Sequence, residues 1–126
     1  MVLIDTSIWI EYFKGNKNSL PLNKLIDLNN VCTNDLILSE LIPAINHKKE
    51  SAIKNLLLEI TKIPLRINWD DIIKMQTLNL KNGINKIGIP DLIIAQNAVN
   101  NNLEIFSMDN HFFLMADYHK LKIYKA

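Results

Sequence analysis

Two kinds of apolar spacing alternate along this chain and predict a series of strands and helices. Short, mostly apolar runs that read as strands fall at 2–4, 31–33, 63–67, 103–106 and 121–124, and the first of them is continuously apolar. Longer stretches with apolar residues every three or four positions predict helices at 8–13, 21–28, 35–47, 51–61, 69–82, 90–99 and 112–118. Because Pro64 has no backbone N–H to donate, the third strand is expected at an edge of the sheet.

This alternation predicts an α/β fold, in which a short, mostly parallel sheet lies between two helical layers in a three-layer α/β/α sandwich. The 126 residues suffice for one domain spanning 1–126. An apolar content of 48% with 21% charged residues excludes a disordered chain.

The cysteine count and the net charge limit which cellular compartment and which binding partners are expected. Cys32 is the single cysteine, so no internal disulfide forms, and its place in the second apolar run predicts a core residue. The chain has no leader-like segment and no apolar stretch near the roughly 20 residues that span a bilayer, so we expect no membrane association and a cytoplasmic protein. Since the net charge is only +1, a polyanionic partner would have to be held by local lysines or through a metal ion.

Three aspartates are expected at one edge of the sheet. Asp5 ends the first strand, Asp109 follows the fourth, and Asp91 lies in the first turn of the helix that Pro90 opens. Ligands of open parallel sheets bind at the carboxyl ends of the strands, where these three residues are predicted to meet. Each one alone could instead cap a helix or complement its dipole. Together, like charges in one crevice repel each other unless a cation is present.

Glu40 is predicted to join them. It shares a helical face with Ile37 and Ala44, so it is expected either to be paired in the interior or to line a pocket. No arginine or lysine lies one turn away to pair with it, which favours the pocket.

Four carboxylates without a nearby fixed base fit a hard, oxygen-preferring cation such as Mg2+. Zinc fits poorly, because there is one cysteine and the histidines at 47, 111 and 119 lack a ligand spacing. His111 lies nearest to the expected site, but a surface or packing role is the simpler interpretation for each histidine.

Four segments, in this order, resemble the PIN-domain nucleases, and more narrowly the VapC-like toxins of type II toxin–antitoxin pairs. They are Val2-Leu3-Ile4-Asp5-Thr6-Ser7, Ser39-Glu40-Leu41, Ile89-Pro90-Asp91-Leu92-Ile93-Ile94-Ala95 and Ser107-Met108-Asp109-Asn110-His111-Phe112. The likeness covers essentially the whole chain.

The resemblance implies roles for particular residues. Asp5, Glu40, Asp91 and Asp109, hereafter the acidic quartet, match the acids that bind Mg2+ or Mn2+ and perform catalysis in this family. Thr6 and Ser107 match hydroxyl positions that orient those acids.

The resemblance also implies an activity and partners: an endoribonuclease that cleaves tRNA or rRNA, is neutralised by a cognate antitoxin and forms a homodimer. One departure is that no arginine lies near Asp109, where many relatives have a basic residue. Candidate RNA-binding residues are therefore lysines, at Lys14, Lys17, Lys48 and Lys86.

Alternatives remain open at this point. The chain could be a PIN-like RNA-binding module without a toxin role, or a general RNA-processing nuclease. A phosphoacceptor receiver domain would need an acid pair after the first strand, and a haloacid-type phosphatase would need an aspartate where Ser7 stands. Neither pattern is clear in this sequence.

Overall fold

A five-stranded parallel sheet lies at the centre of the molecule, as the computed structural model shows for residues 1–125. The spatial strand order is β3-β2-β1-β4-β5. The strands are β1 (Val2–Ile4), β2 (Val31–Thr33), β3 (Thr61–Lys62), β4 (Glu104–Phe106) and β5 (Lys122–Ile123). All strand pairings are parallel, and β1, at the centre, pairs with both β2 and β4.

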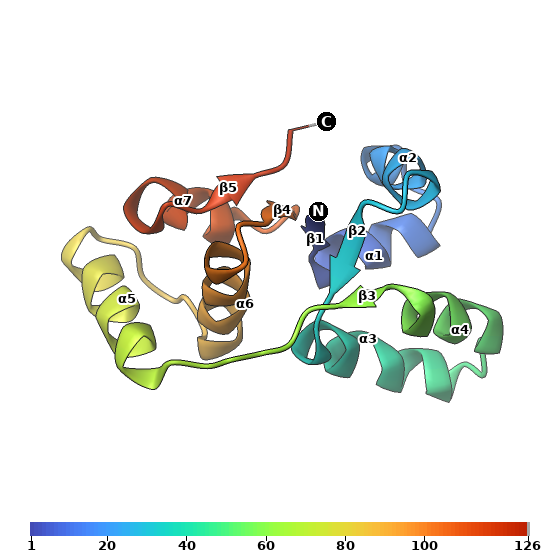
Figure 1. Cartoon of the computed structure of the whole chain (residues 1–126), viewed down its shortest axis with the longest axis horizontal. Helices are drawn as coiled ribbons and strands as arrows, with labels where there is room; N and C mark the ends of the chain where they lie inside the picture. Colours follow the sequence, from blue (N-terminus) through green and yellow to red (C-terminus); the bar gives the residue numbers. More distant parts are fainter. Residues whose placement is uncertain (126) are drawn as a thin grey trace.

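Helices cover both sides of this sheet, which Figure 1 shows nearly along the strands, with α1 and α2 on one side and α5 and α6 on the other. The helices are α1 (Thr6–Phe13), the 3-10 turn η1 (Lys17–Ser19), α2 (Pro21–Asp27), α3 (Asp35–His47), α4 (Ser51–Glu59), α5 (Trp69–Lys81), α6 (Ile89–Asn100) and α7 (Asn110–His119). The predicted α/β/α architecture is thereby confirmed.

The core follows from the apolar runs. All residues of β1 and β2 are buried, as are seven consecutive residues of α6 from Leu92 to Ala98. Cys32 is fully buried among them, as predicted, and burial raises the pKa of its thiol to about 11. Trp9 is also fully buried and stacks on Phe13, with ring centroids 5.7 Å apart.

The prediction for the third strand was wrong in position. The strand is Thr61–Lys62, whereas residues 63–67 are not part of a strand. The last ladder bond runs from the Ile63 N–H to the Thr33 carbonyl at 2.8 Å, and Pro64 then has no N–H to continue the ladder. The short 3-10 turn η1 was not predicted.

Asparagine side chains fix the starts of α3 and α5. The Asn34 side chain accepts from the Ile37 N–H and that of Asn68 from the Asp71 N–H, at 2.9 and 3.0 Å. Asparagine is among the residue types most favoured at the N-cap. No helix among residues 1–125 is long and apolar enough to cross a bilayer.

Candidate active site

Asp5 lies where β1 passes into α1, and hydroxyl groups hold its side chain in place. It is 6% exposed, and its Oδ2 accepts hydrogen bonds from the Ser7 and Ser107 hydroxyls at 2.7 and 2.8 Å. Oδ2 also accepts a longer bond from the Ser7 N–H at 3.4 Å, so Asp5 is the N-cap of α1. Within residues 1–125 no group donates a hydrogen bond to Oδ1, which leaves that oxygen available to a cation.

The two serines join the ends of the neighbouring strands β1 and β4. Ser7 Oγ accepts from the Met108 N–H at 3.0 Å, and Ser107 Oγ accepts from the Asp109 N–H at 2.9 Å. Each hydroxyl has one proton, and both hydroxyls donate it in a hydrogen bond to Asp5. The 3.3 Å contact between the two hydroxyl oxygens is therefore not a hydrogen bond. The loop carrying Asp109 is thus fastened to Asp5.

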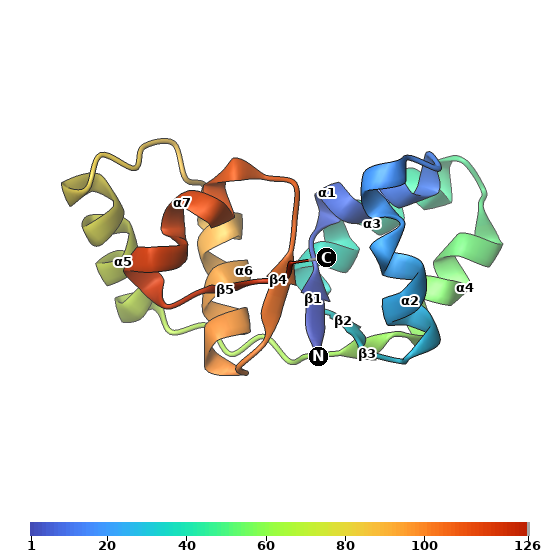
Figure 2. The ribbon, with the colours of Figure 1, turned by 90° about the horizontal axis from the view of Figure 1, so that it is seen from above.

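Asp109 and Asp91 lie at the N-terminal ends of two adjacent helices. Asp109 is the N-cap of α7, where its Oδ1 accepts from the His111 N–H at 2.9 Å. Asp91 lies in the first turn of α6. In Figure 2 the start of α6 and the β4–α7 connection lie at the same edge of the molecule as the start of α1.

His111 lies between these two acids. Its Nδ1 is 2.8 Å from Asp91 Oδ2 and 3.5 Å from Asp109 Oδ1. One ligand atom from each of the three residues lies within 4.8 Å of the others, as in a metal site. The hydrogen bond that His111 donates to Asp91 raises the pKa of His111, and the charges of both acids act in the same direction.

Glu40 reaches the group from α3. Its Oε1 accepts a hydrogen bond from the Thr6 hydroxyl at 3.2 Å. Of the residues on its helical face, Ile37 is buried but Ala44 is exposed. Glu40 is exposed as well, which rules out the alternative that it is paired in the interior. Glu40 therefore lies at the border between the inner and outer faces of α3.

The charges of the acidic quartet act on one another and shift the pKa values of two of its members. Partial burial is the largest cause of a raised pKa at both Glu40 and Asp91. The charge of Asp5 raises the pKa of both residues further, that of Asp91 acts on Glu40, and that of Asp109 acts on Asp91. Repulsion of this kind is what a divalent cation would relieve.

A comparison with known families decides where the chain belongs. The family model described as PIN domain matches residues 2–118, which is most of the chain. The chain belongs to the PIN domain family. Its members are generally nucleases, which supports the nuclease predicted from the sequence.

Solved structures of similar fold agree with this assignment. The chain resembles VapBC2 from Rickettsia felis, solved with a promoter DNA fragment, with a TM-score of 0.75 and 18% identity over 98% of both chains. It resembles FitAcB from Neisseria gonorrhoeae with a TM-score of 0.71 and 18% identity, covering 99% of this chain and 97% of that one. It also resembles a toxin–antitoxin complex from Klebsiella pneumoniae, with a TM-score of 0.64 and 20% identity, covering 89% of this chain and 90% of that one. At identities this low, the likeness shows a shared fold and no more. No curated protein matches the chain in sequence.

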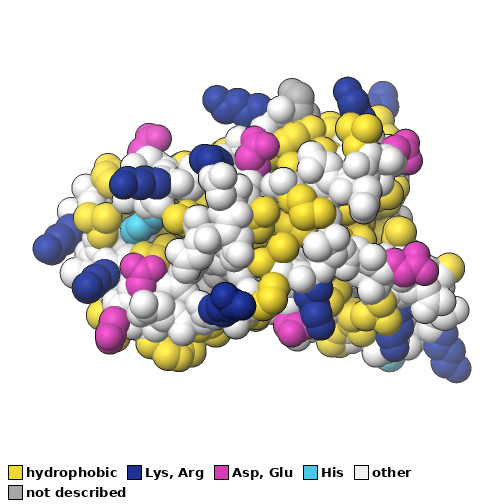
Figure 3. All heavy atoms as spheres, viewed as in Figure 1, with side chains coloured by type: hydrophobic (Ala, Val, Ile, Leu, Met, Phe, Trp, Pro, Cys, Tyr) yellow, Lys and Arg dark blue, Asp and Glu magenta, His cyan; other side chains and the backbone are white. Residues whose placement is uncertain are grey.

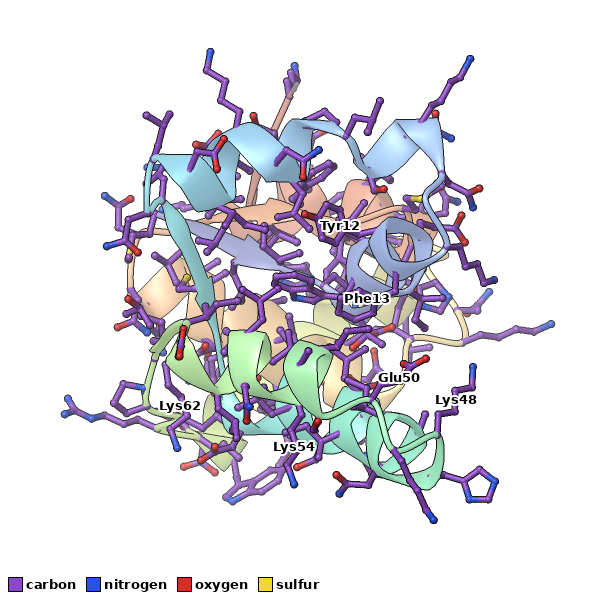
Figure 4. All side chains as sticks on the ribbon, turned by 90° about the vertical axis from the view of Figure 1, so that its right-hand side faces the viewer. Tyr12, Phe13, Lys48, Glu50, Lys54 and Lys62 are labelled. Carbon is purple, nitrogen blue, oxygen red and sulfur yellow. The ribbon has the colours of Figure 1, made fainter. Side chains whose placement is uncertain are left out.

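The candidate RNA-binding lysines of this PIN domain lie outside the acidic quartet. Lys14 and Lys48 line one shallow groove between α1, α3 and α4, and Lys14 also pairs with Glu11 at 3.9 Å. In Figure 4, Phe13 lies toward α4 and Lys48 extends from the end of α3 near Glu50. Lys17 is exposed in η1, and Lys86 is exposed in the loop before α6.

Positive charge does not gather into one patch on the face in Figure 3, where the lysine and arginine side chains are scattered. No ion pair joins these four lysines to the acidic quartet within residues 1–125.

Sequence reasoning missed one hydroxyl of this PIN domain and undervalued one histidine. Ser7 was not expected to contact Asp5, although a serine two residues after an N-cap aspartate is a recognisable local hydrogen-bonding pattern. His111 was thought to be a surface or packing residue, yet it contacts two acids. The contact with Asp91 crosses between two helices, so local spacing did not indicate it.

Proposed function

We propose that this PIN domain is a Mg2+- or Mn2+-dependent endoribonuclease, the toxin of a toxin–antitoxin pair. The observation that supports it most is the linkage of three acids of the acidic quartet at one edge of the sheet, where Ser107 joins Asp5 to Asp109 and His111 contacts both Asp91 and Asp109. Within residues 1–125, no group donates a hydrogen bond to Asp5 Oδ1. We assign Asp5, Glu40, Asp91 and Asp109 to metal binding and catalysis, with Thr6 and Ser107 orienting Glu40 and Asp5.

The donor set suits a divalent ion, since it offers carboxylate oxygens from three helix starts and from α3. When bound, such an ion supplies an activated water and neutralises charge on the scissile phosphate. Ser7 and Ser107 fix the Asp5 carboxylate through Oδ2, so Oδ1 is presented in a single orientation. Thr6 likewise orients Glu40.

Attack by water makes no use of the ribose 2′-hydroxyl, so the products are expected to carry a 5′ phosphate and a 3′ hydroxyl. Preference for RNA would then come from binding contacts. Lys14 and Lys48 lie about 12–14 Å along α1 and α3 from the acids, at 1.5 Å per residue, where they can neutralise flanking phosphates. Lys17 and Lys86 are assigned the same role.

The direct test is cleavage of tRNA and rRNA by the purified protein with Mg2+, with and without chelator. Asp5→Asn should lower the cleavage rate by about 100-fold or more, the scale of losing a group that stabilises the transition state. Asp117→Asn, which neutralises an exposed acid of α7, is the matched control and should cut normally. RNA binding without cleavage by the unmodified protein would instead favour an RNA-binding module.

The toxin role rests on the similar folds seen in toxin–antitoxin complexes. Expression of the chain should arrest growth, and co-expression of a neighbouring antitoxin frame should restore it. The Asp5→Asn variant should leave growth unaffected. Arrest by that variant would separate any toxicity from cleavage.

We also propose a cytoplasmic homodimer. A buried free cysteine suits a reducing compartment. Trp69 and Ile73, one turn apart on α5, are 57% and 64% exposed and supply apolar surface for a second copy. Light scattering should give twice the 14.5 kDa chain mass, and a monomer at micromolar concentration would contradict the homodimer.

A further inference from the structure

His111 differs in chemistry from the acids that surround it, and its position gives it access to the same cation. Its ring belongs to the second residue of α7, and its own N–H bonds to the N-cap Asp109. The helix start therefore fixes the backbone of this residue relative to Asp109. The ring reaches across to Asp91 in the first turn of α6.

The separations among the three side chains are those of neighbouring ligands on one ion. Metal–ligand distances near 2.1 Å place adjacent ligands of an octahedral ion about 3 Å apart. The Nδ1 of His111 lies 2.8 Å from Asp91 Oδ2 and 3.5 Å from Asp109 Oδ1. The ring is about one-third exposed, so no packed side chains enclose it on all sides.

We propose that His111 is a metal ligand through Nδ1, and that it makes this centre prefer a first-row transition ion, such as Mn2+, over Mg2+. The inference rests on the proposed function, which places a divalent ion at the acidic quartet. Mg2+ takes oxygen ligands almost without exception, whereas imidazole nitrogen binds transition ions well. A centre of Asp91, Asp109 and His111 supplies two oxygens and one nitrogen, which suits the transition ion.

The alternative is that His111 only donates a hydrogen bond that positions Asp91. The variant His111→Asn separates the two roles. An asparagine amide can still donate to Asp91, while its nitrogen does not bind metals, and the backbone N–H that Asp109 caps is retained. His47→Asn, at the exposed end of α3, is the matched control.

The experiment uses Mn2+ as a spectroscopic probe of the full chain. Electron spin echo spectroscopy should detect coupling of bound Mn2+ to a nitrogen-14 nucleus in the unmodified protein and in His47→Asn, and the coupling should be lost in His111→Asn. Titration should show Mn2+ affinity falling about tenfold or more in His111→Asn. The Mg2+ affinity, measured by competition, should change much less.

Two results would overturn the proposal. One is Mn2+ bound to the unmodified protein without nitrogen coupling, a measurement that needs no variant and so does not depend on how a variant folds. The other is coupling or selectivity that survives in His111→Asn. In neither case is His111 the ligand, and the proposed nuclease stands in both. Absence of any Mn2+ or Mg2+ binding, together with absence of RNA cleavage, would instead remove the proposed function itself.

Discussion

Asp5 is the most deeply buried member of the acidic quartet. Hydrogen bonds from hydroxyl groups, and not a basic side chain, offset the cost of burying its charge. A buried charge without partners is costly, and hydrogen bonds to a charged group contribute about 1.5–3 kcal/mol each. Ser7 and Ser107 therefore stabilise the fold and at the same time hold a candidate ligand. One oxygen of Asp5 is used for structure and the other is left for chemistry.

Replacing Ser107 tests this arrangement. Ser107→Ala removes a hydroxyl from Asp5 Oδ2 and an acceptor from the Asp109 N–H, so we expect a loss of about 2 kcal/mol in the free energy of unfolding. Urea titration measures it. Ser39→Ala, which removes an exposed hydroxyl that bonds within its own helix, is the control and should be nearly neutral. Equal effects of the two changes would contradict a structural role for Ser107.

Neutralising Asp91 should stabilise the metal-free protein. Burial and the charges of Asp109 and Asp5 raise the pKa of Asp91, so its charged form is disfavoured despite the contact with His111. Asp91→Asn should raise the melting temperature in chelator and abolish cleavage. A clear fall in melting temperature would mean that Asp91 is mainly a structural residue of α6.

The stability of the metal-free protein should fall as the pH rises through neutrality. His111 has a raised pKa in the fold, so its contribution is complete below the unfolded value of 6.5 and is lost as the pH passes the folded value. Asp91 and Glu40 also have raised pKa values, so the stability that their protonated forms contribute is lost at lower pH, from about pH 4 upward. Melting temperatures in chelator from pH 6 to 8 should fall less in His111→Ala, and an unchanged slope would contradict the pairing.

At the scale of elements, two asparagine caps of the same kind differ in what lies behind them. Asn68 caps α5 at the surface. Asn34 is fully buried, and its Nδ2 donates to Asn97, which in turn donates to the Pro64 carbonyl. This chain of hydrogen bonds connects the start of α3 with α6 and with the segment after β3.

Asn34→Ala should therefore destabilise more than Asn68→Ala. Loss of a cap alone costs about 1 kcal/mol, whereas loss of Asn34 also leaves the buried Asn97 carbonyl oxygen without its donor, for about 2–4 kcal/mol in all. Chemical denaturation of both variants gives the comparison. Similar losses would show that the buried contacts add nothing.

The elements that the sequence predicts well are those set by local chemistry. Pro90 indicated the first turn of α6, and helical spacing of apolar residues placed α3 and α5 within about one residue of their ends. The third strand was misplaced because its pairing depends on β2, and the apolar residues after Lys62 pack against the core without a ladder. The contacts made by Ser7, His111 and Glu40 depend on residues distant in sequence, which local patterns do not show.

For the whole molecule, the topology assembles the acidic quartet. A parallel sheet with β1 between β2 and β4 brings the starts of α1, α3 and α7 to one edge, and α6 begins there as well (Figure 2). Asp5 and Asp109, far apart in sequence, are joined through Ser107. Both are also helix caps, and in Asp5 the capping oxygen is Oδ2, so its Oδ1 is left for metal binding.

The most direct test is the anomalous diffraction of a crystal grown with Mn2+. We predict a metal peak among the carboxylates of Asp5, Glu40, Asp91 and Asp109, within direct or water-mediated bonding distance of each. The peak should vanish in crystals of Asp91→Asn. A map without Mn2+ between these side chains, at concentrations that support RNA cleavage, would contradict the metal-dependent nuclease.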